Sequence, residues 1–300
     1  MPAGSPASAP KATAIPRRSA ARAATLSPAA RRNAAQAAGG ALIDLDRYPI
    51  DDPFSPTCQR LVDDCRAQLR ETGVAALPGF VRADSIASMA AEMQVRAVQA
   101  YSCHGRHNVY LKAPDLELPA DHPRNREMET QVGSIAWDEI GPDAALRLLY
   151  LWDPLATFVG AVLERQPFYR FADPLGACTV NVFRPGTGHG WHFDEAEFAT
   201  SLMLQTAEKG GDFDYVPFLR PRRGEDFDAV RRVLDGDESQ VRRLPFEPGT
   251  LSIFSGRRSL HRVTRCGGRR DRLVAILCFA SEPDAVNTDA FRKLYWGRTK

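Results

Sequence analysis

Residues 183–198 read F-R-P-G-T-G-H-G-W-H-F-D-E-A-E-F, a glycine-rich approach to a histidine and an acid. In this stretch, His192 and Asp194 are separated by one residue. On a β-strand, residues i and i+2 point to the same face. An imidazole and a carboxylate on one face can both reach a single ion, so the stretch predicts half of a metal site carried by a strand.

A third ligand is available far downstream, at His261 in S-L-H-R-V-T. Two histidines and one carboxylate form the facial triad of non-haem Fe(II) oxygenases, which leaves coordination positions open. The alternative is a solvated loop in which a histidine and an acid share an ordinary hydrogen bond. The strand-like P-G-T-L-S-I-F at 248–254 precedes His261 and favours the metal site. Such ligands suit Fe(II) better than Mg²⁺ or Ca²⁺, so we predict a catalytic Fe(II) centre at His192, Asp194 and His261.

Arg272 opens the apolar run R-L-V-A-I-L-C-F at 272–279, where a guanidinium is costly unless it is paired. Arginine binds a carboxylate through two parallel hydrogen bonds. Given the metal site, the expected partner is the distal carboxylate of 2-oxoglutarate; otherwise Arg272 is a strand-end residue that reaches solvent. Asn181 points inward on strand 177–183 and can bond the same cosubstrate, or it is a core side chain satisfied by backbone.

Further polar residues are candidates for substrate binding. His189 and Glu195 each lie three residues from His192 and are expected at the mouth of the site. Glu195 can hold an ammonium group, or it is simply a surface acid. The segment C-H-G-R-H-N-V-Y at 103–110 lacks four well-spaced zinc ligands and is by default a polar loop. If that loop is a lid over the site, it contributes to substrate binding through His107, Asn108 and Tyr110, joined by Arg124 of D-H-P-R-N.

The surrounding pattern predicts an α+β protein. Short strands with tight turns fill the C-terminal half, with one inserted helix at 227–234, and indicate a jelly-roll, cupin-like core over about 171–282. Helices buttress this core over 41–170. The first helix is capped by Ser55 and ends at Gly73, and the second is capped by Asp84 and runs to about Tyr101. A pair of helices is expected around 142–165. A short strand is expected at 73–81, and residues 102–135 should be polar and irregular.

Composition, net charge and cysteine content bear on disorder, binding partners and cellular location. Residues 1–40 form an Ala/Pro/Arg-rich tail predicted to be disordered, although an acid-free leader also resembles a transit peptide, and 41–300 form one domain. The net charge of +2 suggests no nucleic-acid partner, and no apolar run is long enough for a membrane span. The six cysteines show no disulfide spacing, which favours a reducing, cytoplasmic setting. The expected partner is a small molecule, and the oligomeric state stays open.

From about Tyr101 to Thr299 the chain resembles the standalone Fe(II)/2-oxoglutarate amino-acid halogenases and hydroxylases of the BesD/HalD type. The segments that carry the resemblance are H-N-V-Y-L, P-A-D-H-P-R-N, A-D-P-L-G-A-C-T-V-N-V, G-W-H-F-D-E-A-E-F-A-T-S-L-M-L-Q, G-G-D-F-D-Y-V-P, P-G-T-L-S-I-F-S-G-R-R-S-L-H-R-V-T and Y-W-G-R. The resemblance implies a double-stranded β-helix, Fe(II), 2-oxoglutarate and O2 as cofactors, and often a free amino acid as substrate.

One departure from that family bears on the chemistry. Halogenases of this type place glycine where this chain has Asp194, which frees a coordination position for chloride. The carboxylate fills that position here, so the resemblance implies hydroxylation of an aliphatic C–H bond. Val274 stands where many 2-oxoglutarate oxygenases have Ser or Thr, which affects how the cosubstrate is anchored. The alternatives are halogenation or desaturation on the same scaffold, a non-catalytic cupin-like metal-binding module, or a structural protein in which the triad is coincidental.

Overall fold

The computed structural model describes residues 36–300, so the prediction of disorder for 1–35 lies outside the described residues. Residues 36–40 were predicted to belong to the disordered tail, with the folded domain beginning at residue 41, but they are ordered. They are helical, and the Gln36 amide donates to the Leu151 carbonyl at 3.0 Å and accepts from the Asp153 amide. These bonds to a distant helix pair hold the backbone in place, which local composition does not reveal.

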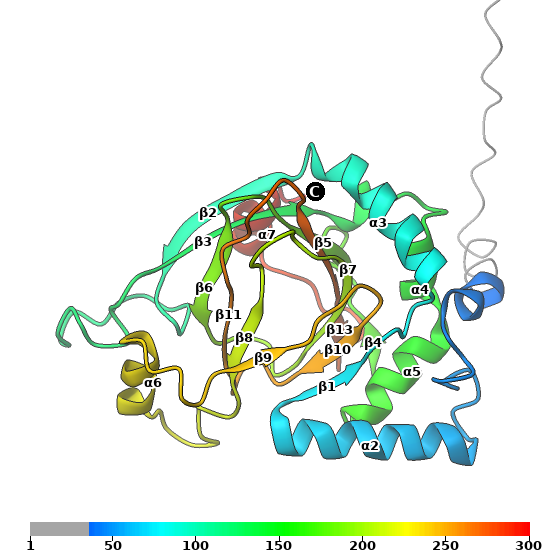
Figure 1. Ribbon diagram of the computed structural model, residues 1–300, viewed down its shortest axis with the longest axis horizontal. Helices are drawn as coiled ribbons and strands as arrows, with labels where there is room; N and C mark the ends of the chain where they lie inside the picture. The colour runs from blue at the N-terminus through cyan, green and yellow to red at the C-terminus, as the bar shows by residue number, and fades with distance from the viewer. Residues whose placement is uncertain (1–35) are drawn as a thin grey trace, which may run out of the picture.

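The core is an antiparallel sheet of eleven strands that curls on itself (Figure 1). Its path runs β1-β10-β7-β12-β5-β3-β6-β11-β8-β9, with β2 added to β3. The strands are β1 (Val74–Leu77), β2 (Tyr101–His107), β3 (Met128–Ile135), β5 (Cys178–Phe183), β6 (Gly188–His192), β7 (Ala199–Gln205), β8 (Phe213–Val216), β9 (Arg242–Leu244), β10 (Leu251–Phe254), β11 (Leu260–Val263) and β12 (Arg272–Leu277). The short strands β4 (Tyr169–Arg170) and β13 (Phe279–Ala280) form a separate pair.

Two halves of the sheet face one another, and β3 joins them. One half is β1-β10-β7-β12-β5 and the other is β6-β11-β8-β9. β3 pairs with β5 through Gly133–Ile135 and with β6 through Thr130 and Gln131. This arrangement confirms the predicted double-stranded β-helix.

Alternation along β12 shows how the core is divided. Leu273, Ala275 and Leu277 pack into the cluster shared with the helices. Val274 belongs to a second cluster inside the barrel. Because successive residues of a strand face opposite sides, Arg272 also points into the barrel.

Helices cover the outer face of the β1–β5 half, as Figure 1 shows. They are η1 (Gly40–Leu42), α2 (Pro56–Thr72), α3 (Ala83–Ala97), α4 (Ala145–Leu151) and α5 (Asp153–Val162), with η2 (Trp137–Glu139) preceding α4. Helix α6 (Phe227–Leu234) is the predicted insertion and lies near the loop that joins β2 to β3, where His122 contacts Phe227 with ring centroids 4.6 Å apart. Helix α7 (Asp289–Trp296) follows the last strands and packs on β2 and β3.

The boundaries of α2 are as predicted, whereas those of α3 are not. The Ser55 side chain accepts a hydrogen bond from the Cys58 amide at 3.2 Å, and Gly73 ends α2 with a φ of 77°. In contrast, α3 begins at Ala83, and Asp84 lies inside its first turn, bonded to Ser85 rather than capping. An acid in the first turn favours a helix through its dipole without being the cap residue, so the sequence signal was displaced by two residues.

The expectation of irregular structure over 102–135 holds for the loop at 108–127 and was wrong for the segments on either side of it. β2 and β3 pair from Tyr101↔Ser134 to His107↔Met128, so the segment assigned to helical support contributes two strands to the core. β2 is paired on one side only and most of its residues are exposed or half-buried. A strand at an exposed edge lacks the apolar alternation by which a strand is detected.

Asp173 fastens helix α7 to the sheet. This buried carboxylate accepts hydrogen bonds from the backbone amides of Leu175, Gly176 and Asn287, and it pairs with Arg292 at 2.9 Å. Asp173→Asn removes the charge and turns an amide donor toward these donors, so we expect the free energy of unfolding to fall by about 3–5 kcal/mol. Chemical denaturation of both proteins measures the loss.

The loss should also depend on pH. Burial by itself raises the pKa of Asp173, but the backbone donors and Arg292 outweigh it and hold this pKa below its usual value. A depressed carboxyl pKa stabilises the fold above about pH 4 and loses that effect as pH falls through the folded-state pKa. Asp138→Asn is the matched control, because its pair with Arg298 is half-exposed and should contribute at most about 1 kcal/mol. Equal losses for the two variants would contradict this assignment.

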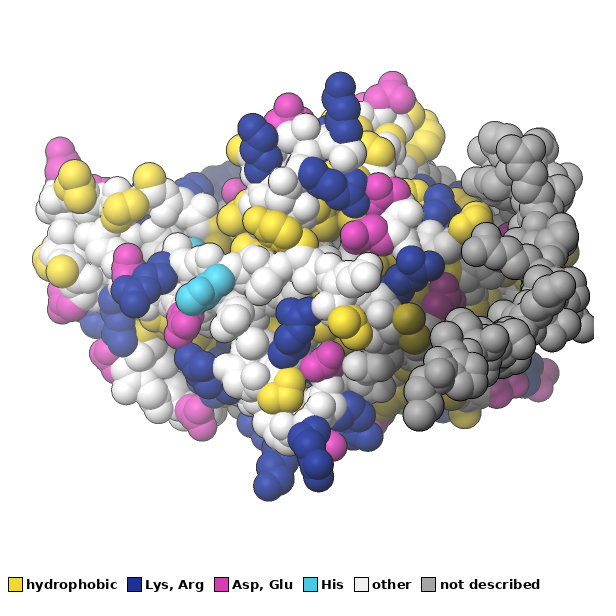
Figure 2. Space-filling model, turned by 90° about the horizontal axis from the view of Figure 1, so that it is seen from above, with side chains coloured by type: hydrophobic (Ala, Val, Ile, Leu, Met, Phe, Trp, Pro, Cys, Tyr) yellow, Lys and Arg dark blue, Asp and Glu magenta, His cyan; other side chains and the backbone are white. Residues whose placement is uncertain are grey.

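The surface carries mixed charge. Figure 2 shows basic and acidic side chains interspersed over the face seen from above. Within residues 36–300 no single helix is long and apolar enough to cross a membrane, and the bent pair α4–α5 meets that test only by length and composition.

Candidate metal centre

The fold brings His192, Asp194 and His261 together, as the sequence predicted. β6 and β11 are antiparallel neighbours, and His261 lies opposite His192 in their register. Asp194 Oδ1 lies 3.6 Å from His192 Nε2 and 3.4 Å from His261 Nε2. One detail differs: β6 ends at His192, so Asp194 is placed by the loop after the strand and not by strand alternation. Potential ligand atoms of all three residues lie within 4.8 Å of one another.

Both histidines are oriented by backbone carbonyls. His192 Nδ1 lies 2.8 Å from the Gly190 carbonyl, and His261 Nδ1 lies 2.9 Å from the Ser259 carbonyl. A carbonyl oxygen can only accept, so each Nδ1 carries the hydrogen and each Nε2 keeps its lone pair. Fixing the tautomer through the other ring nitrogen is how proteins aim histidine ligands at a metal.

The electrostatics hold His192 and Asp194 in the charge states that a metal requires. Burial, followed by the neighbouring His261, lowers the pKa of His192 to about 4. Burial alone would raise the pKa of Asp194, but the two imidazoles outweigh it and hold that pKa below its usual value. A neutral imidazole and an ionised carboxylate are the metal-binding forms.

Gly256 makes room for the carboxylate. The Asp194 amide donates to the Gly256 carbonyl at 3.1 Å. A Cβ on Gly256 would lie 2.6 Å from Asp194 Cγ and closer still to Oδ2. Any side chain at 256 therefore competes with the carboxylate for the same space.

A β-bulge brings His189 beside the triad. On a regular strand, residues three apart face opposite sides, but the pairing of β6 with β11 shifts register between His261 and Val263. As a result the His189 ring stacks on that of His192, with centroids 3.7 Å apart. Among the contacts of residues 36–300, neither ring nitrogen of His189 has a hydrogen-bond partner in the protein, which leaves both available to a ligand.

His107 also reaches the site, with its ring centroid 5.6 Å from that of His189. Its Nδ1 donates to the Asn108 carbonyl at 3.0 Å, and its Nε2 accepts from the Thr130 hydroxyl at 2.6 Å. Both nitrogens are thus satisfied by the protein, so His107 presents a ring face or edge to the site.

The other residues of the predicted lid are used within the loop itself. The Asn108 amide donates to the carbonyls of Lys112 and Arg124 and accepts from the backbone amides of Tyr110 and Lys112. These four bonds exhaust an asparagine side chain. Arg124 lies 3.9 Å from Asp115 in the same loop.

Tyr110 packs behind the metal ligands. Its ring stacks on Phe193 at 5.6 Å, and Phe193 lies between two ligands in sequence but belongs to a separate apolar cluster. Glu195 is exposed, and its carbonyl accepts from Arg257 Nε at 2.9 Å. The structure therefore gathers His107 and His189 at the triad, and leaves Asn108, Tyr110 and Arg124 in the wall around it.

Arg272 is the largest fully buried side chain of the described residues, at 2% exposure. Its Nε and Nη1 have no hydrogen-bond partner, and burial lowers its pKa to about 10. The rings of Phe183 and Phe246 lie 5.2 and 5.9 Å from the guanidinium. A buried cation with two free N–H donors is poised for an anion that the protein does not supply.

Asn181 shares this interior. It lies opposite Val274 in the register of β5 with β12 and alternates with Val180 and Val182, which face the helices. The inward orientation predicted for Asn181 is thus confirmed.

Two features of the site were missed from sequence. The first is the cradle at Gly256, because the contact is made only in the folded chain. The second is Tyr295 on α7, which packs against the interior cluster. Burial first, and then Cys103, Asp194 and Glu195, raises its pKa to about 12. Its only sequence signal was the Y-W-G-R segment, noted as part of the resemblance.

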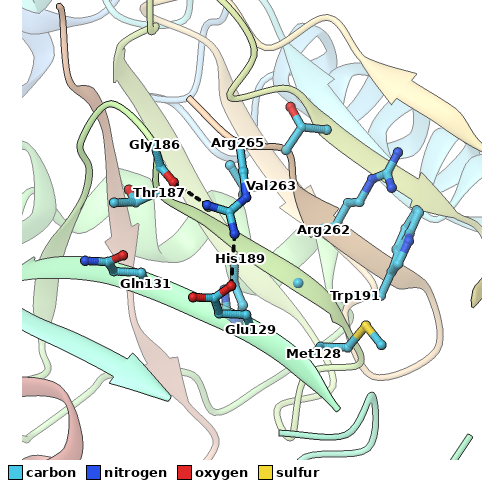
Figure 3. A pocket seen from close by; sticks show the side chains of 13 residues that line it. Met128, Glu129, Gln131, Gly186, Thr187, His189, Trp191, Arg262, Val263 and Arg265 are labelled. Carbon is cyan, nitrogen blue, oxygen red and sulfur yellow. Dashed lines mark hydrogen bonds and ion pairs between the residues drawn. The ribbon is translucent and has the colours of Figure 1, made fainter. Parts of the chain in front are cut away.

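A hollow of about 410 Å³ lies against β3, β6 and β11, and His189 is among the residues that line it (Figure 3). Trp191 and Arg262 line it and alternate with His192 and His261 along their strands, so they face away from the triad. Arg265 pairs there with Glu129 at 2.9 Å and with the Gly186 carbonyl at 2.7 Å. The charged groups that line this hollow are already paired, and we assign the hollow no ligand.

The fold and the His-x-Asp…His cluster inside it define the class of Fe(II)/2-oxoglutarate oxygenases. Among solved structures, the non-haem α-ketoglutarate-dependent epimerase SnoN from nogalamycin biosynthesis is similar (14% identity, TM-score 0.51, 74% of this chain and 83% of that chain). AviO1 from Streptomyces viridochromogenes Tue57 is similar as well (16% identity, TM-score 0.50, 74% and 96%). At these identities the likeness concerns the fold alone.

The family follows from sequence. A family model described as halogenase D matches residues 58–293, so this chain belongs to the halogenase D family. No match was found among curated proteins.

Proposed function

We propose that this protein is an Fe(II)- and 2-oxoglutarate-dependent dioxygenase that hydroxylates an aliphatic C–H bond of a free amino acid or a derivative of one. The observation that carries the proposal is Asp194, which completes a three-ligand site where halogenases of this type have glycine. With that position filled by a carboxylate, chloride has no place at the metal.

The residues fit the cofactors. His192, Asp194 and His261 would hold the iron, since two neutral imidazoles and one carboxylate suit Fe(II) and leave other positions open. When bound with 2-oxoglutarate and O2, the iron supplies the oxidising power needed to break an unactivated C–H bond. The chain itself fixes the ligand tautomers and encloses the centre in an apolar interior.

Arg272 would bind the distal carboxylate of 2-oxoglutarate, and Asn181 would bond the same molecule. Support comes from the unpartnered N–H groups of Arg272, because a buried guanidinium is stabilised by a bidentate carboxylate. Hydrogen bonds at this depth would also orient the cosubstrate toward the metal ligands.

His189 and Glu195 would contact the substrate. The free ring nitrogens of His189 can bond a polar group, and the Glu195 carboxylate can hold an ammonium group at the rim. We propose that His107 shapes the pocket by its ring, while Asn108, Tyr110 and Arg124 hold the loop that encloses it. A cytoplasmic location is part of the proposal, because all six cysteines are free of disulfides.

Product analysis tests this function. The purified protein, Fe(II), 2-oxoglutarate and O2 are incubated with single amino acids in chloride buffer, and succinate and product masses are measured. We expect succinate release coupled to addition of one oxygen atom, with no chlorine, and loss of both in His261→Ala. Chlorinated product would support halogenation, loss of two hydrogens would support desaturation, and iron binding without 2-oxoglutarate binding would support a cupin-like module.

A further inference from the structure

Three arginines without a carboxylate partner lie in two neighbouring loops at the end of the barrel that holds Asp194. Arg222 lies in the loop after β8, and Arg257 and Arg258 lie in the loop after β10. In the described part of the chain, none of the three makes an ion pair, although Arg220 beside them pairs with Glu225 at 3.0 Å. The acid in this loop thus pairs with Arg220 and leaves the other three arginines without a carboxylate partner.

The two loops are tied together next to the metal centre. The Arg220 amide donates to the Arg258 carbonyl at 3.0 Å, and Arg220 Nη1 donates to the Arg257 carbonyl at 3.1 Å. Gly256, which cradles Asp194, directly precedes Arg257. The cluster thus begins one residue from the backbone that supports a metal ligand.

Two of the three guanidinium groups, those of Arg257 and Arg258, are held in place by backbone and aromatic contacts, whereas Arg222 is exposed. Arg257 donates to the carbonyl of Glu195, which offers this oxygen and not its carboxylate. Arg258 lies over the Phe218 ring at 4.7 Å. Phe218 has a φ of 55°, a strained backbone for a bulky residue that persists where surrounding structure enforces it.

Arg222 lies close enough to Arg258 to influence its charge. Burial first, and then the nearby Arg222, lowers the pKa of Arg258. Like charges held together without a counter-ion repel one another, and an anion bound between them removes that repulsion.

We infer that Arg222, Arg257 and Arg258 form an oxyanion site that binds a phosphate group carried by the substrate. This inference rests on the proposed function and narrows its substrate to a phosphorylated amino-acid derivative. Guanidinium forks bind phosphate bidentately, and three cations match a dianion better than a single carboxylate charge. Free inorganic phosphate has the same chemistry, so the test must separate the two sources.

The test is a calorimetric titration of the full-length, metal-free protein with O-phosphoserine, serine and inorganic phosphate. We expect O-phosphoserine to bind more tightly than the other two, and its affinity to fall at least about tenfold in Arg258→Gln and in Arg222→Gln. The double variant Arg60→Gln/Arg269→Gln removes two exposed charges away from the cluster and should bind like the wild type. Circular dichroism confirms that each variant is folded, and the exposed Arg222 offers the mildest change.

Three results would overturn the inference. O-Phosphoserine that binds no better than serine would exclude a phosphate site, and equal affinities for O-phosphoserine and inorganic phosphate would indicate an adventitious ion only. A loss in Arg272→Gln with none in Arg258→Gln would place the anion in the cosubstrate pocket instead. Because the titration uses neither iron nor turnover, its failure leaves the oxygenase proposal to be judged by cofactor binding.

Discussion

Gly256→Ala is expected to weaken Fe(II) binding about ten- to a hundredfold, although residue 256 offers no ligand atom. The added methyl group would occupy the space of the Asp194 carboxylate, 2.6 Å from its Cγ. Gly256 is buried and its amide and carbonyl are both bonded, so the backbone has little freedom to retreat. The carboxylate must turn away, which leaves two histidines to hold the ion.

Competition with a metal-sensitive dye measures this affinity, and Gly105→Ala is the matched control. Gly105 lies on β2, and a Cβ there would meet no atom within 4 Å. The control should bind Fe(II) as the wild type does. If Gly256→Ala keeps its iron affinity while remaining folded, the cradle assigned to Gly256 is wrong.

Arg272→Met is expected to produce two effects of opposite sign. Affinity for 2-oxoglutarate should fall by about 2–5 kcal/mol, because the distal carboxylate would lose a buried, charged hydrogen-bond partner. Without the cosubstrate, the same variant should unfold at a higher denaturant concentration, with a gain of about 1–4 kcal/mol. The gain arises because methionine removes a buried cation whose Nε and Nη1 are unpartnered.

Binding of 2-oxoglutarate and chemical denaturation, each measured on wild type and variant, test the pair of effects. Arg269→Met, at an exposed position three residues earlier, should change neither. A variant that loses stability without cosubstrate would mean that Arg272 already has a stabilising partner in the free protein.

The sequence pattern pointed to the metal triad and to the buried arginine because each places a polar or charged group where it needs a partner. Arg272 begins an apolar strand, where a charged side chain is costly without a partner. His192 and Asp194 are separated by one residue, a spacing that lets both bind one ion. Both signals are read without knowing the fold. Short strands with tight turns indicated the jelly-roll core, and the resemblance to the family implied the double-stranded β-helix.

What the sequence did not yield depends on tertiary contacts. β2 was missed because an exposed edge strand lacks apolar alternation, and β3, although paired on both sides, was missed because it carries the polar run Glu129, Thr130 and Gln131 near its start. His189 was expected at the mouth of the site, but the bulge that stacks its ring on that of His192 could not be read from the spacing. Asn108 looked like a binding residue by type, yet its four hydrogen bonds are all spent on its own loop.

Cofactor binding is the most direct test of the central claim that this fold assembles an Fe(II)/2-oxoglutarate centre. Fe(II) and then 2-oxoglutarate are added to the metal-free protein under anaerobic conditions while the visible absorption spectrum is recorded. The account predicts a charge-transfer band that needs both additions, disappears in His261→Ala and requires more cosubstrate in Arg272→Gln. Absence of iron binding in the wild type, or a band that survives His261→Ala unchanged, would contradict it.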